Sequence, residues 1–378
     1  MGASPTPVPP GAMPATHAPG SSSGSAPGMG QPAGGGATPS GGSGTTGSGD
    51  DGNTKSIHHE NRSKLPFTNP TKVWEEIDKA VDAEMKRTRI GARFLPIRRV
   101  PPKTLTVPSD SYALPPLPAP QIFAVDEGAT VRMNTISCAL QLTPQQVNQE
   151  TGDPKNMGQS TAVTLAMRAA NALAQAEDLI IFQGQNAVLT ATPFTSNLIT
   201  FQGALTDSGL LNLPIGGAAA GPLAPPVNEI VVAPLAPVVP GVIYGPNTFE
   251  GVSQAYAALQ EVGHYGPYAL VLETIPYADT FAPLPATLTL TADRIKPLVQ
   301  AGFFGTGTLP PNPPPAPVAP YYGVLVSLGG NTMDLVVGLD ATTAFLQESP
   351  NGNFLLQVIE RFALRLKDTT AVIRLRFN

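Results

Sequence analysis

Proline limits what this chain can fold into more than any other residue type. The 378 residues include 43 prolines and 38 glycines, together more than a fifth of the chain, yet hydrophobic residues still make up 42%. Because proline fixes its own backbone angle and removes a hydrogen-bond donor, helices and central strands are confined to the stretches between prolines. A segment that cannot order must therefore coexist with a segment that buries a core.

Residues 1–60 are the segment without a core. They consist almost wholly of Gly, Pro, Ser, Ala and Thr. Large apolar side chains are too few to offset the conformational entropy that ordering would remove. We therefore expect a disordered tail, with folded sequence beginning near Lys64.

The first predicted helix comes directly after this tail. Asn69 can cap its amino end, and Pro70 suits the first helical position, where the missing N–H would be unbonded anyway. Apolar residues then recur at helical spacing, with charged residues between them. The spacing predicts a helix of about five turns that ends near Gly91. The apolar residues are Val73, Ile77, Val81 and Met85.

Two more helices have clear boundary signals. An alanine-rich helix is predicted over Thr161–Phe182, and Gly184 suits the position just past its end. Asn247 followed by Glu250 makes a capping-box pattern, which predicts the start of a third helix. Apolar residues recur along this third segment at helical spacing, so we expect it to pack against a core.

The segment from Val100 to Pro120 is dense in proline and must run extended. Strands are predicted on both sides of an Asp126-Glu127-Gly128 turn, at Gln121–Val125 and Thr130–Leu142, which would form a long protruding hairpin. Short apolar runs elsewhere predict further strands. These lie at Leu198–Phe201, Glu229–Val232, Tyr268–Glu273, Gly323–Ser327 and Met333–Gly338.

The strongest strand pattern comes last. Apolar residues alternate with polar or basic ones from Leu356 to Lys367 and, after a Lys367–Thr370 turn, from Ile373 to Phe377. Because successive side chains of a strand point to opposite faces, one face should be core and the other basic and polar. The basic face would carry Arg361 and Arg365.

Few residues suggest catalysis or metal binding. Three of the four histidines, His17, His58 and His59, precede the folded region, and His264 lies in a sequence typical of a turn. Glu177 and Asp178 are interpreted as surface or subunit contacts, not as an acid–base pair. The single cysteine, Cys138, excludes an internal disulfide and a cysteine-rich metal site. We therefore expect no catalytic residue, no metal and no cofactor.

Composition also limits the partners. Only 13% of residues are charged and the formal net charge is −5, so no overall field attracts nucleic acid. No apolar run approaches the ~20 residues that a spanning helix needs, and the first residues do not resemble a secretory signal. We expect a cytoplasmic protein whose partners are other proteins.

Four blocks of sequence, in order, resemble the shell proteins of encapsulin compartments of family 1, formerly described as linocin-like bacteriocins. The first block corresponds to an amino-terminal helix and the strand after it, and the second to the end of the long helix. The third and fourth blocks each contain predicted strands. They are Leu65–Thr68 with Trp74–Asp78 and Gly91–Phe94; Ala176–Gly184; Gly266–Leu272; and Glu360–Leu366 running into Ala371–Phe377. The resemblance covers roughly residues 64–378.

This resemblance implies an α+β fold of the phage major-capsid (HK97-type) class, with a peripheral domain, an extended loop and an axial domain. The tail is longer than the family usually carries, and residues 185–245 and 305–320 look like insertions. The expected segments are a tail at 1–60, the first helix and strand at 61–99, the extended loop at 100–142, a peripheral domain with the long spine helix at 143–245, the axial domain at 246–345, and strands returning to the peripheral domain at 346–378.

The resemblance also implies a function. Identical subunits would form a closed icosahedral shell around a cargo enzyme, with small molecules entering through pores. A short targeting peptide on the cargo would dock in an apolar groove. The groove would be formed by Trp74, Ile77, Val81, Phe94 and Phe345, although these could equally be ordinary core residues. The tail, joined to a helix that faces the interior, would lie inside the shell. The alternatives are a phage or prophage major capsid protein and a secreted bacteriocin or protease.

Overall fold

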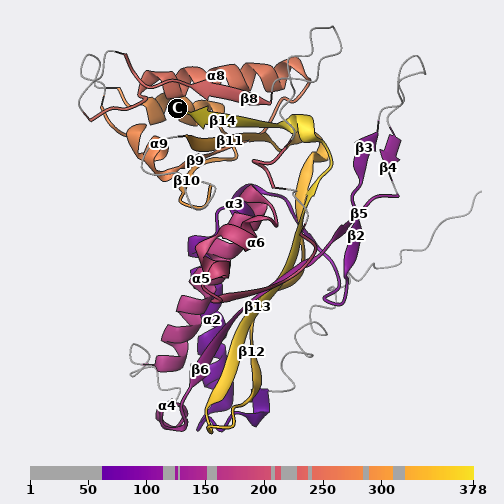
Figure 1. Cartoon of the computed structure of the whole chain (residues 1–378), viewed down its shortest axis with the longest axis vertical. Helices are drawn as coiled ribbons and strands as arrows, with labels where there is room; N and C mark the ends of the chain where they lie inside the picture. Colours follow the sequence, from indigo (N-terminus) through magenta and orange to yellow (C-terminus); the bar gives the residue numbers. More distant parts are fainter. Residues whose placement is uncertain are drawn as a thin grey trace, which may run out of the picture. The chain divides into compact units, whose positions relative to one another are not determined.

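The computed structural model describes residues 62–113, 124–126, 128–150, 160–205, 209–213, 228–236, 241–283, 289–309 and 320–378. The predicted disordered tail at 1–60 lies outside these ranges, as do parts of the two predicted insertions. The helices and strands that pack around the core all fall between residues 62 and 378 (Figure 1).

A five-stranded sheet forms the first half of the core. Its centre is the antiparallel pair β12 (Met333–Glu348) and β13 (Phe354–Leu366). β6 (Asn134–Leu142) pairs antiparallel with β13, and β7 (Ile199–Gln202) pairs with β6. The other edge is β1 (Ile97–Arg99), which runs parallel to β12. The chain thus joins segments more than 200 residues apart in one sheet.

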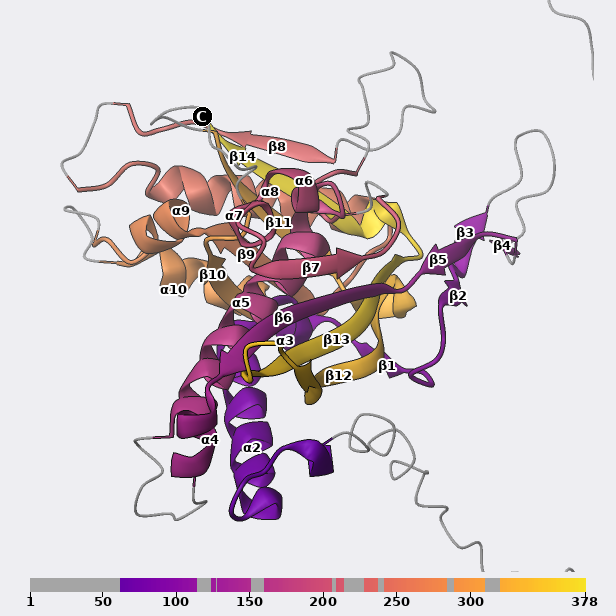
Figure 2. The same cartoon turned by 60° about the horizontal axis from the view of Figure 1, so that its bottom comes forward.

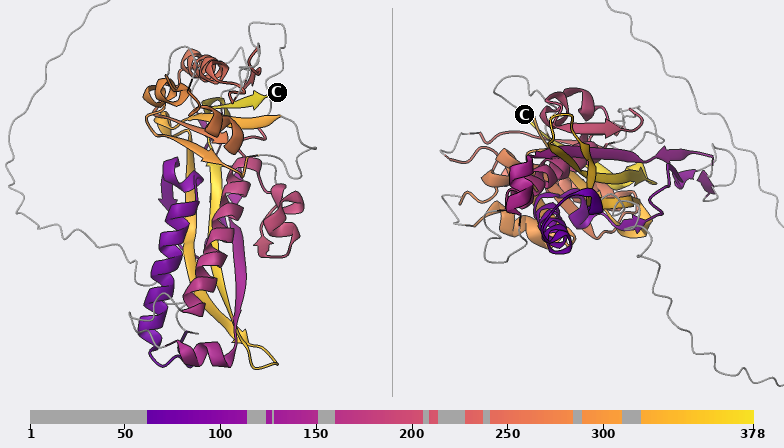
Figure 3. Two further views of the ribbon diagram at one scale, coloured as in Figure 1. Left: turned by 90° about the vertical axis from the view of Figure 1, so that its left-hand side faces the viewer. Right: turned by 90° about the horizontal axis from the view of Figure 1, so that it is seen from below.

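Two long helices cover one face of this first sheet. α2 (Pro70–Thr88) and α5 (Thr161–Gln183) pack against each other and against the central strands (Figures 1 and 3). Phe362 and Leu364 point to this face and join the same core cluster as the helices. Gly184 has a positive φ of 75° at the end of α5, which a residue without a Cβ adopts readily. Both helices were predicted from periodicity, and both are confirmed.

An extended ribbon covers part of the opposite face. β2 (Thr106–Pro108) pairs with β5 (Thr130–Arg132), and β3 (Ser111–Ala113) pairs with β4 (Ala124–Asp126). Val107 packs with Val336 and Ala363 on this face of the sheet. The short strands β2 and β3 show that the described part of the predicted extended segment runs as expected. The predicted pairing of 121–125 with 130–142 is wrong, because β4 and β5 each pair with a strand of the outgoing segment instead of with each other.

A second five-stranded sheet has the order β10-β9-β11-β14-β8. Its middle strands β9, β11 and β14 are antiparallel, while the outer strands β10 and β8 run parallel to their neighbours. α8 (Pro246–Glu261) packs on it through Val252 and Leu259. The strand bounds are Tyr268–Glu273 for β9, Gly302–Thr306 for β10, Tyr321–Ser327 for β11, Val372–Phe377 for β14 and Glu229–Val232 for β8.

Short elements connect these layers (Figure 2). The short α-helices are α3 (Gly91–Phe94), α4 (Pro144–Gln149), α6 (Ala187–Thr190), α7 (Thr192–Thr195), α9 (Thr274–Asp279) and α10 (Thr291–Ile295). The 3₁₀ turns are η1 (Arg62–Lys64), η3 (Lys296–Leu298), η4 (Gly329–Asn331) and η5 (Thr369–Ala371).

The carboxyl-terminal strands serve both sheets. β13 lies in the first sheet, but β14 crosses to the second, where it pairs with β11 and β8. Since β13 and β14 join different sheets, the residues from 346 onward do not all return to one layer. Most of β12 falls within the segment 246–345 that was expected to be the axial domain, but β12 pairs with β13 in the first sheet.

One predicted helix start differs from the structure. α8 begins at Pro246 after Gly245, whose φ is 47° and which makes no side-chain cap. Asn247 lies inside the first turn, and its amide donates to the carbonyls of Ala233 and Pro234. The capping-box prediction is wrong because this side chain binds the preceding loop instead of the helix end.

Candidate docking residues and buried polar clusters

The five predicted docking residues are all buried. Trp74, Ile77 and Val81 lie on the inner face of α2, Phe94 ends α3, and Phe345 lies in β12. None exposes more than 7% of its surface, and all belong to one core cluster. The structure brings them into the same core, where they stabilise the contact between α2 and the sheet. Their role in docking stays a prediction.

Two aromatic members have specific neighbours. The Trp74 indole N–H donates to the Arg62 carbonyl at 3.3 Å, and its ring meets Phe67 edge to face. Phe94 stacks on Phe304 of β10, with ring centroids 5.9 Å apart. Phe94 therefore ties the end of the first helical segment to the second sheet.

Arg62 is a structural residue that sequence reasoning missed. Its guanidinium lies over the Trp74 ring, pairs with both Asp78 oxygens at 2.7 Å and donates to the Thr343 carbonyl. Only 5% of Arg62 is exposed. The residue therefore fixes the start of α2 against β12, although it precedes Lys64, where folded sequence was expected to begin.

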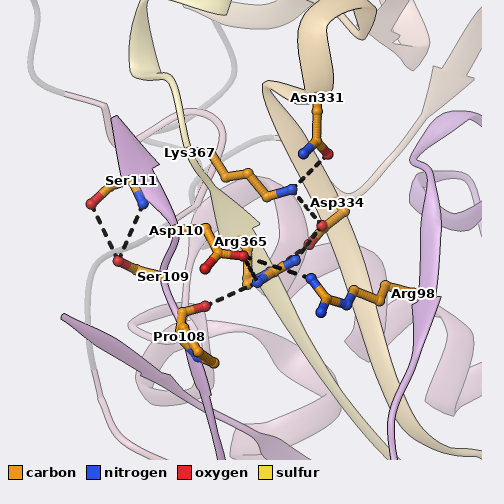
Figure 4. Close-up of polar contacts among 9 residues, drawn as sticks. All are labelled: Arg98, Pro108, Ser109, Asp110, Ser111, Asn331, Asp334, Arg365 and Lys367. Carbon is orange, nitrogen blue, oxygen red and sulfur yellow. Dashed lines mark hydrogen bonds and ion pairs between the residues drawn. The ribbon is translucent and has the colours of Figure 1, made fainter. Parts of the chain in front are cut away.

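A charged cluster joins the first sheet to the extended ribbon (Figure 4). Arg365 of β13 lies directly opposite Asp334 of β12, and its Nε and Nη2 donate to the two oxygens of that carboxylate at 2.7 and 2.5 Å. Lys367 also pairs with Asp334, at 2.8 Å. Arg365 Nη1 donates to the carbonyl of Pro108 at 3.0 Å and to Asp110 Oδ2 at 2.5 Å.

The cations of this cluster affect the pKa of Asp334 more than burial does. Burial alone would raise the pKa of Asp334, but the hydrogen bonds from Arg365 and Lys367 hold that pKa below its usual value. The bond to Asp334 in turn raises the pKa of Arg365. The predicted basic face of β13 is therefore not solvated at Arg365, which is 1% exposed and fully paired.

A second buried cluster holds more carboxyls than cations. Glu177 of α5 and Glu360 of β13 are completely buried, and both lie near Arg89, whose Nη1 is 3.7 and 3.3 Å from their oxygens. Asp178 accepts hydrogen bonds from the backbone N–H groups of Ile90 and Gly91. The expectation that Glu177 and Asp178 are surface or subunit contacts is wrong within this protomer, since both are buried in its core.

Burial dominates the ionisation of this second cluster. It raises the pKa of Glu360 to about 8 although Arg89 opposes the shift, and it raises the pKa of Glu177 well above its usual value. It also raises the pKa of Asp178 to about 7, against the two backbone hydrogen bonds. One arginine cannot neutralise both buried glutamates, so protonated forms of Glu177 and Glu360 are favoured near neutral pH.

A cavity of about 270 Å³ lies between the end of α5 and the second sheet. Gln183, Tyr322 and Arg374 line part of it. Arg374 is paired with Glu229 and donates to the Leu211 carbonyl, so its charge is already neutralised. Within the described ranges no three His, Cys, Asp or Glu side chains are arranged to hold a metal ion. The described helices also include none long and apolar enough to cross a membrane.

Comparisons with known proteins agree with this fold. Residues 244–363 match the family described as "Encapsulating protein for peroxidase". The chain is 28% identical over 213 residues to the type 1 encapsulin shell protein EncA of Myxococcus xanthus, and the match covers 56% of this chain and 58% of that relative. It is also similar to the virus-like particle of Pyrococcus furiosus, with a TM-score of 0.52, 14% identity and coverage of 80% of this chain and 98% of that one.

These findings confirm the expected fold class, an α+β fold of the phage-capsid (HK97-type) class. The matched family segment runs from just before α8 through β9, β10 and β11 of the second sheet and β12 of the first sheet, and it ends within β13. Residues 244–363 therefore match the model of the encapsulating-protein family, and the resemblance of the chain to encapsulin shell proteins is confirmed.

Proposed function

We propose that this chain is the shell-building protomer of a closed icosahedral encapsulin compartment in the cytoplasm, one that encloses a cargo enzyme and admits small molecules through pores. The observation that carries this proposal is the family match over residues 244–363 on a capsid-type fold. The match extends over only 58% of the curated relative, so assembly and cargo are inferred for this chain.

Exposed apolar residues support assembly with other copies of the chain. Leu105 and Val125 of the extended ribbon segment are 66% and 47% exposed, and Leu346 near the end of β12 is 44% exposed. Burying such side chains between identical subunits is favourable, and closed symmetry limits growth. Partners are therefore identical subunits, and the chain itself acts as a structural protein, not as an enzyme.

Imaging and mass spectrometry test this proposal together. The purified full-length protein should form uniform hollow particles in negative stain, and the particles should contain a co-purifying protein. Packaged DNA would instead support the alternative of a phage major capsid protein. Hydrolytic or antibacterial activity of a homogeneous monomer without particles would support the secreted bacteriocin or protease.

The cargo groove can be tested separately from core packing. Val81 and Val73 lie on the same helix, both 1% exposed, but only Val81 belongs to the proposed groove. Each Val→Ala change should lower the free energy of unfolding by roughly 1–3 kcal/mol. If Val81 also contacts cargo, Val81→Ala should reduce cargo per particle while Val73→Ala does not. Equal cargo loading in both variants would mean that Val81 is a core residue only.

The tail proposal has its own test. We infer that residues 1–60 lie inside the shell. Limited proteolysis of intact particles should then leave the tail uncut, whereas dissociated protein should lose it quickly. Rapid removal of residues 1–60 from intact particles would place the tail outside.

A further inference from the structure

The base of the extended ribbon is held by charge as well as by apolar packing. Val107 and Met133 supply a small buried contact with the sheet. Next to this contact, the backbone carbonyl of Pro108 and the carboxylate of Asp110 both accept from Arg365 Nη1 (Figure 4). The ribbon is therefore attached at two nearby points to one guanidinium.

That guanidinium is itself fixed in orientation. Its other two nitrogens form a bidentate pair with Asp334, the cross-strand neighbour of Arg365 in the sheet. Lys367 holds the same carboxylate and donates to Asn331. A planar bidentate pair restricts direction as well as distance, so Arg365 presents Nη1 to the ribbon from a rigid position.

Asp110 occupies the joint between the two strand pairs of the ribbon. It lies between β2 and β3 and has a φ of 51°, a left-handed conformation that Asp and Asn tolerate better than most residues. Arg98 of the edge strand β1 approaches the same carboxylate at 3.6 Å. The point at which the ribbon bends is therefore bound by side chains from two strands of the first sheet.

We propose that Arg365 and Asp110 form a joint clamp that sets the direction in which the distal ribbon, β3 and β4, leaves the first sheet. The clamp prepares the ribbon to meet a second copy of this chain. A ribbon held in one direction loses less conformational entropy when it is buried between subunits than one that samples many directions. This inference rests on the proposed shell function and assigns a positioning role within it.

The variant Asp110→Asn tests the clamp without disturbing the backbone. Asn has nearly the same size and tolerates the left-handed conformation, so the change removes mainly the charge and one strong acceptor. Asp293→Asn is the matched control, because Asp293 is an exposed aspartate paired with Lys296 on the distant segment α10. Both variants are made in the full-length chain.

Two measurements report on the clamp. Backbone hydrogen exchange at residues 106–113 and 130–132 should become about tenfold faster in Asp110→Asn, as expected from losing a hydrogen bond to a charged group, while β12 and β13 keep their protection. Negative-stain images should show a several-fold lower particle yield or a broader range of diameters. Asp293→Asn should match the parent chain in both measurements.

The outcomes separate the clamp from the proposed function. If the parent forms uniform particles and Asp110→Asn forms the same particles with unchanged exchange, the clamp is overturned while the shell function stands. If exchange rises equally in β12 and β13, the cluster stabilises the sheet instead of directing the ribbon, and the clamp is again overturned. If the parent forms no particles at all, the shell function itself fails.

Discussion

The two buried polar clusters on β13 differ in the ratio of cations to carboxyl groups. Around Arg365, the two buried cations Arg365 and Lys367 meet the carboxylates of Asp334 and Asp110, and the exposed Arg98 also approaches Asp110. Around Arg89, a single cation lies near Glu177 and Glu360, with Asp178 close by on α5. The buried charges of the first cluster are therefore balanced, and that cluster links the sheet to the ribbon. The second cluster is unbalanced and lies between the helices and the sheet.

Burial alone therefore does not decide how these carboxyls ionise. Paired cations lower the pKa of Asp334, while uncompensated burial raises the pKa of Glu360 to about 8. A lowered carboxyl pKa contributes stability above the unfolded value and loses it as pH falls. A carboxyl group whose pKa is raised in the folded state contributes stability at low pH, and this contribution is lost as pH rises. The two clusters should therefore weaken at opposite ends of the pH scale.

Replacing Arg365 in the balanced cluster should lower the free energy of unfolding more than any other change proposed below. Arg365→Met leaves Asp334 buried with one partner fewer, and breaking a buried pair in this way should lower the free energy of unfolding by roughly 3–5 kcal/mol. Chemical denaturation measures this. Arg98→Met is the matched control, because Arg98 meets the same Asp110 from an exposed position, and it should cost less than about 1 kcal/mol. Equal losses in the two variants would contradict the larger contribution assigned to the buried pair.

A smaller change is expected from neutralising the unbalanced cluster. The pKa of Glu360 lies at about 8 in the folded chain and near 4.5 otherwise, so folding takes up a proton between these values and the parent loses stability as pH rises through them. Glu360→Gln carries no such proton. Between about pH 5 and about pH 9 the parent should therefore lose more unfolding free energy than Glu360→Gln.

The control for this pH comparison is an exposed glutamate. Glu348→Gln makes the same chemical change at the outer end of β12 and should leave the pH dependence of the parent unaltered. Identical pH profiles for the parent and Glu360→Gln would contradict the assignment of a raised pKa to Glu360.

Breaking a surface ion pair should change the free energy of unfolding least, which provides a reference for the Arg365→Met and Glu360→Gln measurements. Lys86 and Asp82 form an i,i+4 pair on α2 at 2.7 Å, with both side chains more than half exposed. Lys86→Ala should lower the unfolding free energy by only about 0.3–0.5 kcal/mol, and added salt should erase the difference. A loss as large as that of Arg365→Met would contradict the distinction between buried clusters and surface pairs.

Local sequence signals correctly predicted the helices and strands whose boundaries depend on residues within the segment itself. The helix over 161–182 was found almost to the residue because its alanine content and the glycine after it act within the segment itself. The fully buried strand Tyr268–Glu273 and the short strand Glu229–Val232 matched their apolar runs. β12 proved longer than predicted, since register shifts after Val337, Leu339 and Phe345 interrupt its alternation.

Features that depend on distant partners could not be predicted from local pattern. Glu360 and Arg89 are 271 residues apart in sequence, and no local signal shows that they share a buried site. β13 and β14 have the same alternating pattern, which does not reveal that they join different sheets. Three of the candidate docking residues, Trp74, Ile77 and Val81, lie on the buried side of α2. The same apolar pattern is typical of a groove and of an ordinary core, so their role in docking stays a prediction.

The position of β13 and β14 has a consequence for synthesis on the ribosome. β13 lies in the middle of one sheet and β14 next to the edge strand of the other, and their partners β6 and β8 are made more than a hundred residues earlier. Neither layer can close until residues 354–377 have been translated, and contacts so distant in sequence form slowly. A polypeptide that ends before β13 would therefore lack the central strand of one sheet and an inner strand of the other.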